Sequence, residues 1–113
     1  MVEDYDFGRI VVDGKPYHSD VLLFPDGRIL SPWWREESHR LGVADLQALI
    51  DTQPEVLIVG TGSSGMLQPT EDLPGFLARR AIELVALPTD EAVRVYNDLC
   101  RRRAVAACFH LTC

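Results

Sequence analysis

Hydrophobic residues follow two different patterns along the chain, and the pattern changes at Val43. Before it, two short apolar runs, residues 9–12 and 20–24, each lead into an Asp-Gly pair. Asp-Gly is a strong hairpin signal because such turns need positive φ angles. With residues 28–30 as the next apolar run, the first third of the chain predicts a β-meander of three strands.

Beyond Val43, apolar positions at helical spacing alternate with unbroken apolar runs. The helical spacing predicts three helices, which begin near Val43, after a cap at Asp72 and after a cap at Thr89. Residues 56–59 form an unbroken apolar run, which is typical of a strand covered on both faces. Residues 82–87 and 104–111 predict two further strands. Strands that alternate with helices imply right-handed crossovers, so we expect an α/β fold with helices on both faces of the sheet.

Composition and charge narrow the classes of protein to consider. The chain has 113 residues, of which 47% are hydrophobic and 25% charged, so we expect a single domain over residues 1–113. The net charge of −6 opposes binding to nucleic acid, whose phosphates attract basic proteins. The one basic cluster, residues 101–103, follows the last predicted helix, where positive charge stabilises the helix dipole without any ligand.

Cysteine content and the N-terminal residues predict the compartment. Three cysteines in a chain without a signal peptide are typical of reduced thiols in the cytoplasm. The acidic start, residues 1–6, resembles neither a mitochondrial presequence nor a secretory signal. No apolar run approaches the roughly 20 residues that a membrane-spanning helix needs. We therefore expect a cytoplasmic protein that does not insert into membranes.

A glycine-rich loop after the apolar run 56–59 is the strongest candidate for a ligand site. Its members are Gly60, Thr61, Gly62, Ser63, Ser64 and Gly65. Glycines let a ligand approach the main chain, and loops at the carboxyl ends of parallel strands are where ligands bind in open α/β sheets. A small anion held by these amides is one hypothesis. The alternative is that the glycines only permit a tight bend beside a packed helix.

The same loop also has the spacing G-x-G-x-x-G, which dinucleotide-binding proteins share. In those proteins the third glycine opens a helix, and an acidic residue ends the next strand. Here the next credible cap after Gly65 is Asp72, and the next strand ends in Ala86-Leu87-Pro88. The sequence therefore does not support a dinucleotide site, and we expect no cofactor.

A stretch of aromatic and charged residues, 33–40, is a candidate partner surface. Two adjacent tryptophans in a strand point to opposite faces, so one can be core while its neighbour is exposed. Tryptophan and arginine are enriched at protein interfaces. We therefore consider Trp33, Trp34, Arg35 and His39 as residues that could hold a protein partner.

Cysteine and histidine residues near the end of the chain do not form a convincing metal or catalytic site. Along a strand, Cys108 and His110 share one face, whereas Cys113 has the opposite parity, and no fourth ligand is nearby. Thiol catalysis would need a histidine base, and the spacing nominates none. We predict buried or terminal thiols with a hydrogen-bonded His110, no metal and no assigned catalytic residue.

Several short strings, in order along the chain, resemble one known family. They are Asp20-Val21 with Pro25-Asp26-Gly27, the segment 56–62, Thr89 with Ala92 and residues 96–99, and the segment 106–113. Together they resemble the Mth-type domain of unknown function, a family that includes the adipogenesis-associated Mth-domain protein and mitochondrial complex I assembly factor three. The resemblance implies a three-layer fold with a mixed central sheet plus an N-terminal β-meander. It supplies no catalytic residues, and its assembly-factor branch implies protein–protein contacts.

Two functional hypotheses follow from these observations. The first is a non-enzymatic interaction or assembly protein that binds a protein partner or a second copy of itself. The second is a small-ligand or anion-binding domain, which could also be an enzyme, that uses the glycine loop. We favour the first because no set of nucleophile, base and acid is evident.

Overall fold

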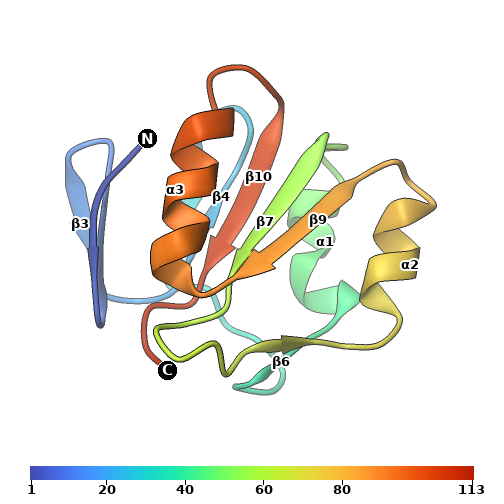
Figure 1. Ribbon diagram of the computed structural model, residues 1–113, viewed down its shortest axis with the longest axis horizontal. Helices are drawn as coiled ribbons and strands as arrows, with labels where there is room; N and C mark the ends of the chain where they lie inside the picture. Colours follow the sequence, from blue (N-terminus) through green and yellow to red (C-terminus); the bar gives the residue numbers. More distant parts are fainter.

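A five-stranded mixed sheet lies at the centre of the computed structural model, which describes residues 1–113 (Figure 1). Its order is β5-β4-β10-β7-β9. The strands are β4 (Val21–Leu23), β5 (Ile29–Leu30), β7 (Val56–Gly60), β9 (Glu83–Leu87) and β10 (Val105–Phe109). The last three are parallel to one another, and β4 runs antiparallel to both β10 and β5. Every residue of β7 and β10 is buried, which confirms that the run at 56–59 is covered on both faces.

Helices cover both faces of this sheet, as the sequence predicts. On one face, α3 (Thr89–Leu99) packs with the N-terminal strands around a cluster of 14 buried residues. On the other face, a cluster of 15 buried residues lies under the short 3₁₀ helix η1 (Val43–Leu46), α1 (Gln47–Ile50) and α2 (Leu73–Ala78). Two separate cores on either side of one sheet make a three-layer α/β fold, which confirms the expected fold class.

The N-terminal meander exists but contains other strands than the sequence predicts. It is a three-stranded antiparallel sheet of β1 (Val2–Asp6), β2 (Arg9–Val12) and β3 (Lys15–Tyr17). The predicted second and third strands are β4 and β5 of the central sheet instead. The reason is burial: all three residues of β4 are buried and pair with β10, whereas β1 and β3 are mostly exposed and give no apolar run.

Both Asp-Gly pairs form turns where they are predicted. Asp13 and Gly14 have φ angles of 50° and 80° and join β2 to β3. Gly27, with a φ angle of 95°, lies between β4 and β5. Positive φ at these positions explains why the turn residues give a reliable hairpin signal.

Trp33 and Trp34 lie in a loop between β5 and β6 (Arg40–Leu41), not in a strand, which corrects the sequence interpretation. The long segment after the glycines contains another strand that the sequence does not predict, β8 (Gln68–Pro69). It pairs in parallel with β6. This small two-stranded sheet lies near the chain's C-terminus in Figure 1.

The helices differ from expectation at their first residues. The first predicted helix is divided into η1 and α1. Thr89 is the first residue of α3, and Pro88 occupies the cap position. The Thr89 hydroxyl does not cap the helix, because it is buried and hydrogen-bonded to other segments. It donates to the His110 carbonyl over 2.7 Å and accepts from the Gly62 amide over 2.8 Å. None of the helices has the length and apolarity to cross a bilayer.

Candidate functional site

The carboxyl ends of β7, β9 and β10 meet at one end of the central sheet, at the bottom of Figure 1. Because β4 runs antiparallel to β10, the residue before β4 lies at this same end. Asp20 precedes β4 and His110 follows β10, so the topology brings together two polar residues that are 90 positions apart in the sequence. This end of the sheet is where open α/β folds bind their ligands.

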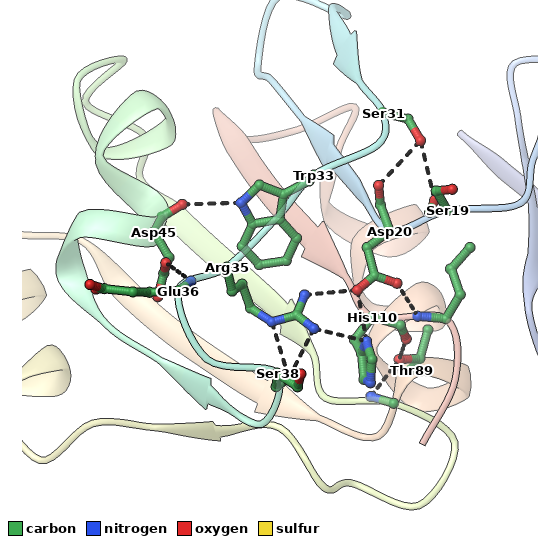
Figure 2. A network of polar contacts seen from close by, with 12 residues as sticks. Ser19, Asp20, Ser31, Trp33, Arg35, Glu36, Ser38, Asp45, Thr89 and His110 are labelled. Atoms are coloured by element: carbon green, nitrogen blue, oxygen red, sulfur yellow. Dashed lines mark hydrogen bonds and ion pairs between the residues drawn. The ribbon is translucent and has the colours of Figure 1, made fainter.

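Asp20, Arg35 and His110 form a buried polar cluster at this end (Figure 2). One oxygen of Asp20, Oδ2, accepts from Arg35 Nη1 over 2.7 Å and lies 2.8 Å from His110 Nδ1. The other, Oδ1, accepts from the Leu111 amide over 2.8 Å. The side chains of Arg35, Asp20 and His110 are only 7%, 16% and 8% exposed. Through these donors the Asp20 carboxylate holds the loop between β5 and β6, which contains Arg35, against the end of β10.

The contacts of Asp20 determine the tautomer of His110. Two groups face Nδ1: Asp20 Oδ2 at 2.8 Å, which can only accept, and Arg35 Nη2 at 3.3 Å, which can only donate. Because the carboxylate oxygen is closer, and a lone pair on Nδ1 would repel it, we assign the proton to Nδ1, which donates to Asp20. Nε2, at the other edge of the ring, points away from Asp20 in Figure 2. It is buried and has no hydrogen-bond partner. An unpaired buried nitrogen is rare in folded proteins, so His110 Nε2 calls for a partner from outside the chain.

Burial and hydrogen bonding have opposite effects on the pKa of Asp20. Burial by itself raises the pKa of this carboxyl group. Hydrogen bonds from His110, Arg35 and the Leu111 amide outweigh burial and hold the pKa below its ordinary value. Asp20 is therefore charged at neutral pH and pairs with Arg35 as an ion.

A pocket of about 440 Å³ opens over this cluster. Ten residues line it, and Asp20, Arg35 and His110 are among them together with Trp33, Trp34 and His39. Trp33 is 5% exposed and donates from Nε1 to the Asp45 carbonyl over 3.2 Å, so its ring is part of the core. Trp34 is 80% exposed. The pocket thus combines a polar cluster with the exposed ring of Trp34.

The structure brings the four predicted partner-surface residues together, but as a pocket wall rather than a flat face. Arg35 packs its guanidinium over the Trp33 ring, 4.9 Å from the centroid, and donates to the Ser38 carbonyl. His39 is exposed, and its ring lies edge-on to His110 with the centroids 6.2 Å apart. Of the four residues, Trp34 and His39 are the ones accessible to a partner.

The glycine loop lies at the same end of the sheet, and most of its amides have partners within the chain. Thr61 donates to the Leu87 carbonyl, Gly62 to the Thr89 hydroxyl, Ser63 to the Thr112 carbonyl and Gly65 to the Gly62 carbonyl. Ser63 and Ser64 have exposed side chains. An anion at these amides would have to replace carbonyl oxygens of the protein itself. The loop residues line no part of the pocket over Asp20.

The cysteines lie apart from one another. All three are free: Cys108 is buried, Cys100 is intermediate and Cys113 is exposed. Burial raises the pKa of the Cys108 thiol, which keeps it protonated and unreactive. No group of three or more His, Cys, Asp or Glu side chains is arranged to hold a metal ion. The prediction of a hydrogen-bonded His110 with buried or terminal thiols agrees with the structure, in which Nδ1 of His110 contacts Asp20, Cys108 is buried and Cys113 is the exposed last residue.

A slightly larger hollow, of about 530 Å³, lies beside α1 and offers a weaker candidate site. Its polar residues include Gln47 and Asp51, which are already hydrogen-bonded to each other over 2.8 Å. It contains no buried polar atom without a partner. We therefore take the pocket over Asp20 as the candidate site.

Sequence reasoning missed Asp20 as a site residue and gave His110 no partner. One signal was available: each is a polar residue at or near the end of a predicted strand segment, residues 20–24 and 104–111. Polar residues in such positions gather at the ends of a sheet. What the sequence did not contain was the pairing of β4 with β10, which places both at the same end.

Comparison with solved structures agrees with this fold. Conserved hypothetical protein PH1505 from Pyrococcus horikoshii OT3 is 29% identical, with a TM-score of 0.88, over 100% of this chain and 99% of that chain. A structure named MT938 is 30% identical, with a TM-score of 0.85, and the match covers 100% of this chain and 98% of that chain. A Bordetella pertussis protein described as a Mth938-like domain is 23% identical, with a TM-score of 0.68, over 98% and 85%, and shows the fold alone.

Residues 2–110 match the family described as "Protein of unknown function (DUF498/DUF598)". This match spans nearly the whole chain, and the similarity to MT938 and to a Mth938-like domain confirms the resemblance found in the sequence. The chain therefore belongs to the DUF498/DUF598 family and has its Mth-type α/β fold.

Proposed function

We propose that this protein binds a small ligand in the pocket over Asp20, Arg35 and His110. The observation that carries the proposal is the Nε2 atom of His110, which is buried without a partner while Asp20 fixes the other edge of the ring. Leaving a buried polar atom unpaired costs about 1–3 kcal/mol. A ligand that supplies the missing hydrogen bond recovers this energy on binding.

The shape and position of the pocket support the same proposal. Its volume, about 440 Å³, lies in the range of small-molecule sites, and it combines a few convergent polar groups with an aromatic wall. It also lies at the carboxyl ends of the parallel strands, as ligand sites do in α/β sheets. The proposal moves the ligand site expected in the sequence from the glycine loop to the neighbouring loop of Arg35.

An amide NMR titration of the ¹⁵N-labelled protein tests this proposal. The panel contains inorganic phosphate, nucleotides, common cofactors and small uncharged compounds. We expect at least one compound to give saturable shifts at the pocket residues Asp20, Arg35, Ser38 and His110. His110→Gln should abolish these shifts. His18→Gln should leave them intact, because His18 is exposed and does not line the pocket.

The alternatives give different spectra. Shifts confined to residues 60–65 would place a small anion at the glycine loop instead. Flat spectra across the panel would count against a ligand function and leave protein interaction as the better hypothesis. Shifts that persist unchanged in His110→Gln would mean that the ring is not part of the site.

Protein interaction is a second candidate function, and the exposure of Trp34 favours it. A tryptophan that is 80% exposed at a pocket rim, next to the exposed His39, resembles the anchor residues of interfaces. The partner could be another protein or a second copy of this chain. Three free cysteines suit a cytoplasmic, reducing compartment for either function.

Self-association through Trp34 can be measured by sedimentation equilibrium. We expect the wild type to form a dimer at high concentration and Trp34→Ala to remain a monomer. Phe7→Ala serves as the matched control, since Phe7 is 62% exposed but does not line the pocket. A wild type that stays monomeric, or a Trp34→Ala variant that dimerises as well as the wild type, would argue against a Trp34-mediated dimer.

A further inference from the structure

The charges at the floor of the pocket are already balanced. Arg35 pairs with Asp20 over 2.7 Å, and its Nε and Nη2 atoms both donate to the Ser38 carbonyl, over 3.3 and 2.9 Å. The positive charge of Arg35 is therefore opposed by a carboxylate within the same cluster. An anionic ligand would meet that carboxylate and gain little net attraction. The site differs in this respect from an anion site, where unpaired donors converge.

The unpaired ring atom of His110, a residue that lines the pocket, is a hydrogen-bond acceptor in the neutral ring. In the neutral ring with its proton on Nδ1, where it donates to Asp20 over 2.8 Å, Nε2 carries a lone pair and no proton. The His110 side chain is almost wholly removed from solvent, since its exposed fraction is 8%. The group that satisfies Nε2 is a hydroxyl or N–H donor. A carboxylate or phosphate oxygen would oppose lone pair to lone pair.

The wall of the pocket is suited to a flat ring. The Trp34 side chain is 80% exposed, and aromatic rings stack on such a surface. His39 is also exposed, and it is the ring that lies against His110, with centroids 6.2 Å apart. Because Nε2 is itself covered, a side chain beside it must move before a ligand can reach it.

We infer that the pocket takes a neutral hydroxyl or N–H donor carried on a flat aromatic ring, held by His110 Nε2 and stacked on Trp34. This inference rests on the proposed function and names the ligand class for the same pocket. It does not concern the glycine loop, whose amides would select an anion. The ring supplies contact area, and the donor supplies the hydrogen bond that the chain leaves unmade.

Phenol and benzoate test the inference because they share one ring and differ in hydrogen-bonding character. Each is titrated into ¹⁵N-labelled protein at pH 8. A long-range ¹H–¹⁵N spectrum follows the Nε2 resonance of His110 directly. We expect phenol to give a saturable Nε2 shift with matching shifts of the pocket amides, and benzoate to give none.

Two further comparisons separate the hydrogen bond from the stacking. Cyclohexanol, which keeps the hydroxyl but lacks a flat ring, should bind more weakly than phenol. Trp34→Ala should weaken phenol binding by about tenfold, the effect of losing one good aromatic contact. The variant should fold normally because the ring is exposed. His110→Phe should abolish binding, but the Trp34 variant keeps the test valid if that protein fails to fold.

The outcomes distinguish this inference from the proposed function. Benzoate saturating the pocket while phenol does not would overturn the inference and leave the pocket a ligand site. Phenol shifts that leave the Nε2 resonance unmoved would also overturn it. The absence of chemical-shift changes with both probes would overturn the inference too. The titration panel described under the proposed function would then decide whether the pocket binds any other compound.

Discussion

Asp20→Ala is expected to destabilise the protein by about 3 kcal/mol, because it leaves a buried guanidinium without its counter-charge. Asp20 is the shared acceptor for Arg35 Nη1, His110 Nδ1 and the Leu111 amide. Removing the carboxylate leaves three donors, one of them charged, without their acceptor. These donors belong to side chains and backbone that are mostly buried. Urea unfolding, monitored by tryptophan fluorescence and by circular dichroism, measures the change.

Two variants serve as controls for the Asp20 result. Asp20→Asn keeps an acceptor oxygen but removes the charge, so we expect a smaller loss of stability than with alanine. Asp26→Ala breaks an exposed ion pair with Arg28 over 2.8 Å, and exposed pairs contribute little. If Asp20→Ala proved no more destabilising than Asp26→Ala, the cluster would not hold the two segments together as described.

The contribution of Asp20 should also depend on pH, with a definite sign. Its pKa in the folded protein lies below the ordinary value of 3.8. A lowered folded-state pKa stabilises the protein above the unfolded-state value, and the stabilisation is lost as pH falls through the folded-state pKa. The stability gap between wild type and Asp20→Asn should therefore be full at neutral pH and shrink in acid. A gap that stayed constant to low pH would contradict the ionic role of Asp20.

Much of the fold could be predicted from the sequence because buried strands and glycine turns each leave a pattern of residue types. The run at β7 is apolar at every position and proves to be covered on both faces. Asp26 and Gly27 likewise form a turn because glycine accepts a φ angle of 95°. The strands that were missed, such as β1, carry mostly exposed residues and pair through the backbone, which leaves no pattern in the side chains.

The candidate site was only partly predictable because it depends on contacts between distant segments. The sequence predicted a binding role for Arg35 and a ligand position at the carboxyl ends of the strands. It could not show that Asp20, from the start of β4, meets His110, from the end of β10. It also could not show which tryptophan is exposed, since the loop conformation that buries Trp33 depends on its contact with Asp45.

Gly62→Ala is expected to destabilise the protein by about 3 kcal/mol, the combined effect of backbone strain and a steric clash. Gly62 has a φ angle of 104°, which residues with a side chain rarely adopt. A Cβ atom there would lie 2.6 Å from the Cys113 carbonyl oxygen and 2.7 Å from the Thr112 carbonyl oxygen. Both contacts are with backbone, so neither can be relieved by turning a side chain.

Gly14→Ala is the matched control, because Gly14 has a similar φ angle of 80° but nothing within 4 Å of the added Cβ. It should cost only the strain of the left-handed conformation, about 1–2 kcal/mol. Amide hydrogen exchange of the Gly62→Ala variant gives a second, independent measurement. In Gly62→Ala, the amides of Ser63 and Met66 should lose protection, since they donate to the Thr112 and Cys113 carbonyls. Equal destabilisation by both variants would mean that residues 112 and 113 are not packed against the loop.

The same variant shows how the glycine loop acts on the pocket. Thr112 lines the pocket, and the Ser63 amide fixes its carbonyl over 2.7 Å. Displacing Thr112 through Gly62 should therefore weaken phenol binding, although no glycine touches the pocket. In that case the small residues of the loop have a positioning role: they let the last residues of the chain pack closely enough to complete the wall beside His110. If phenol binding were unchanged while Ser63 and Met66 lost protection, the glycine loop would be independent of the pocket.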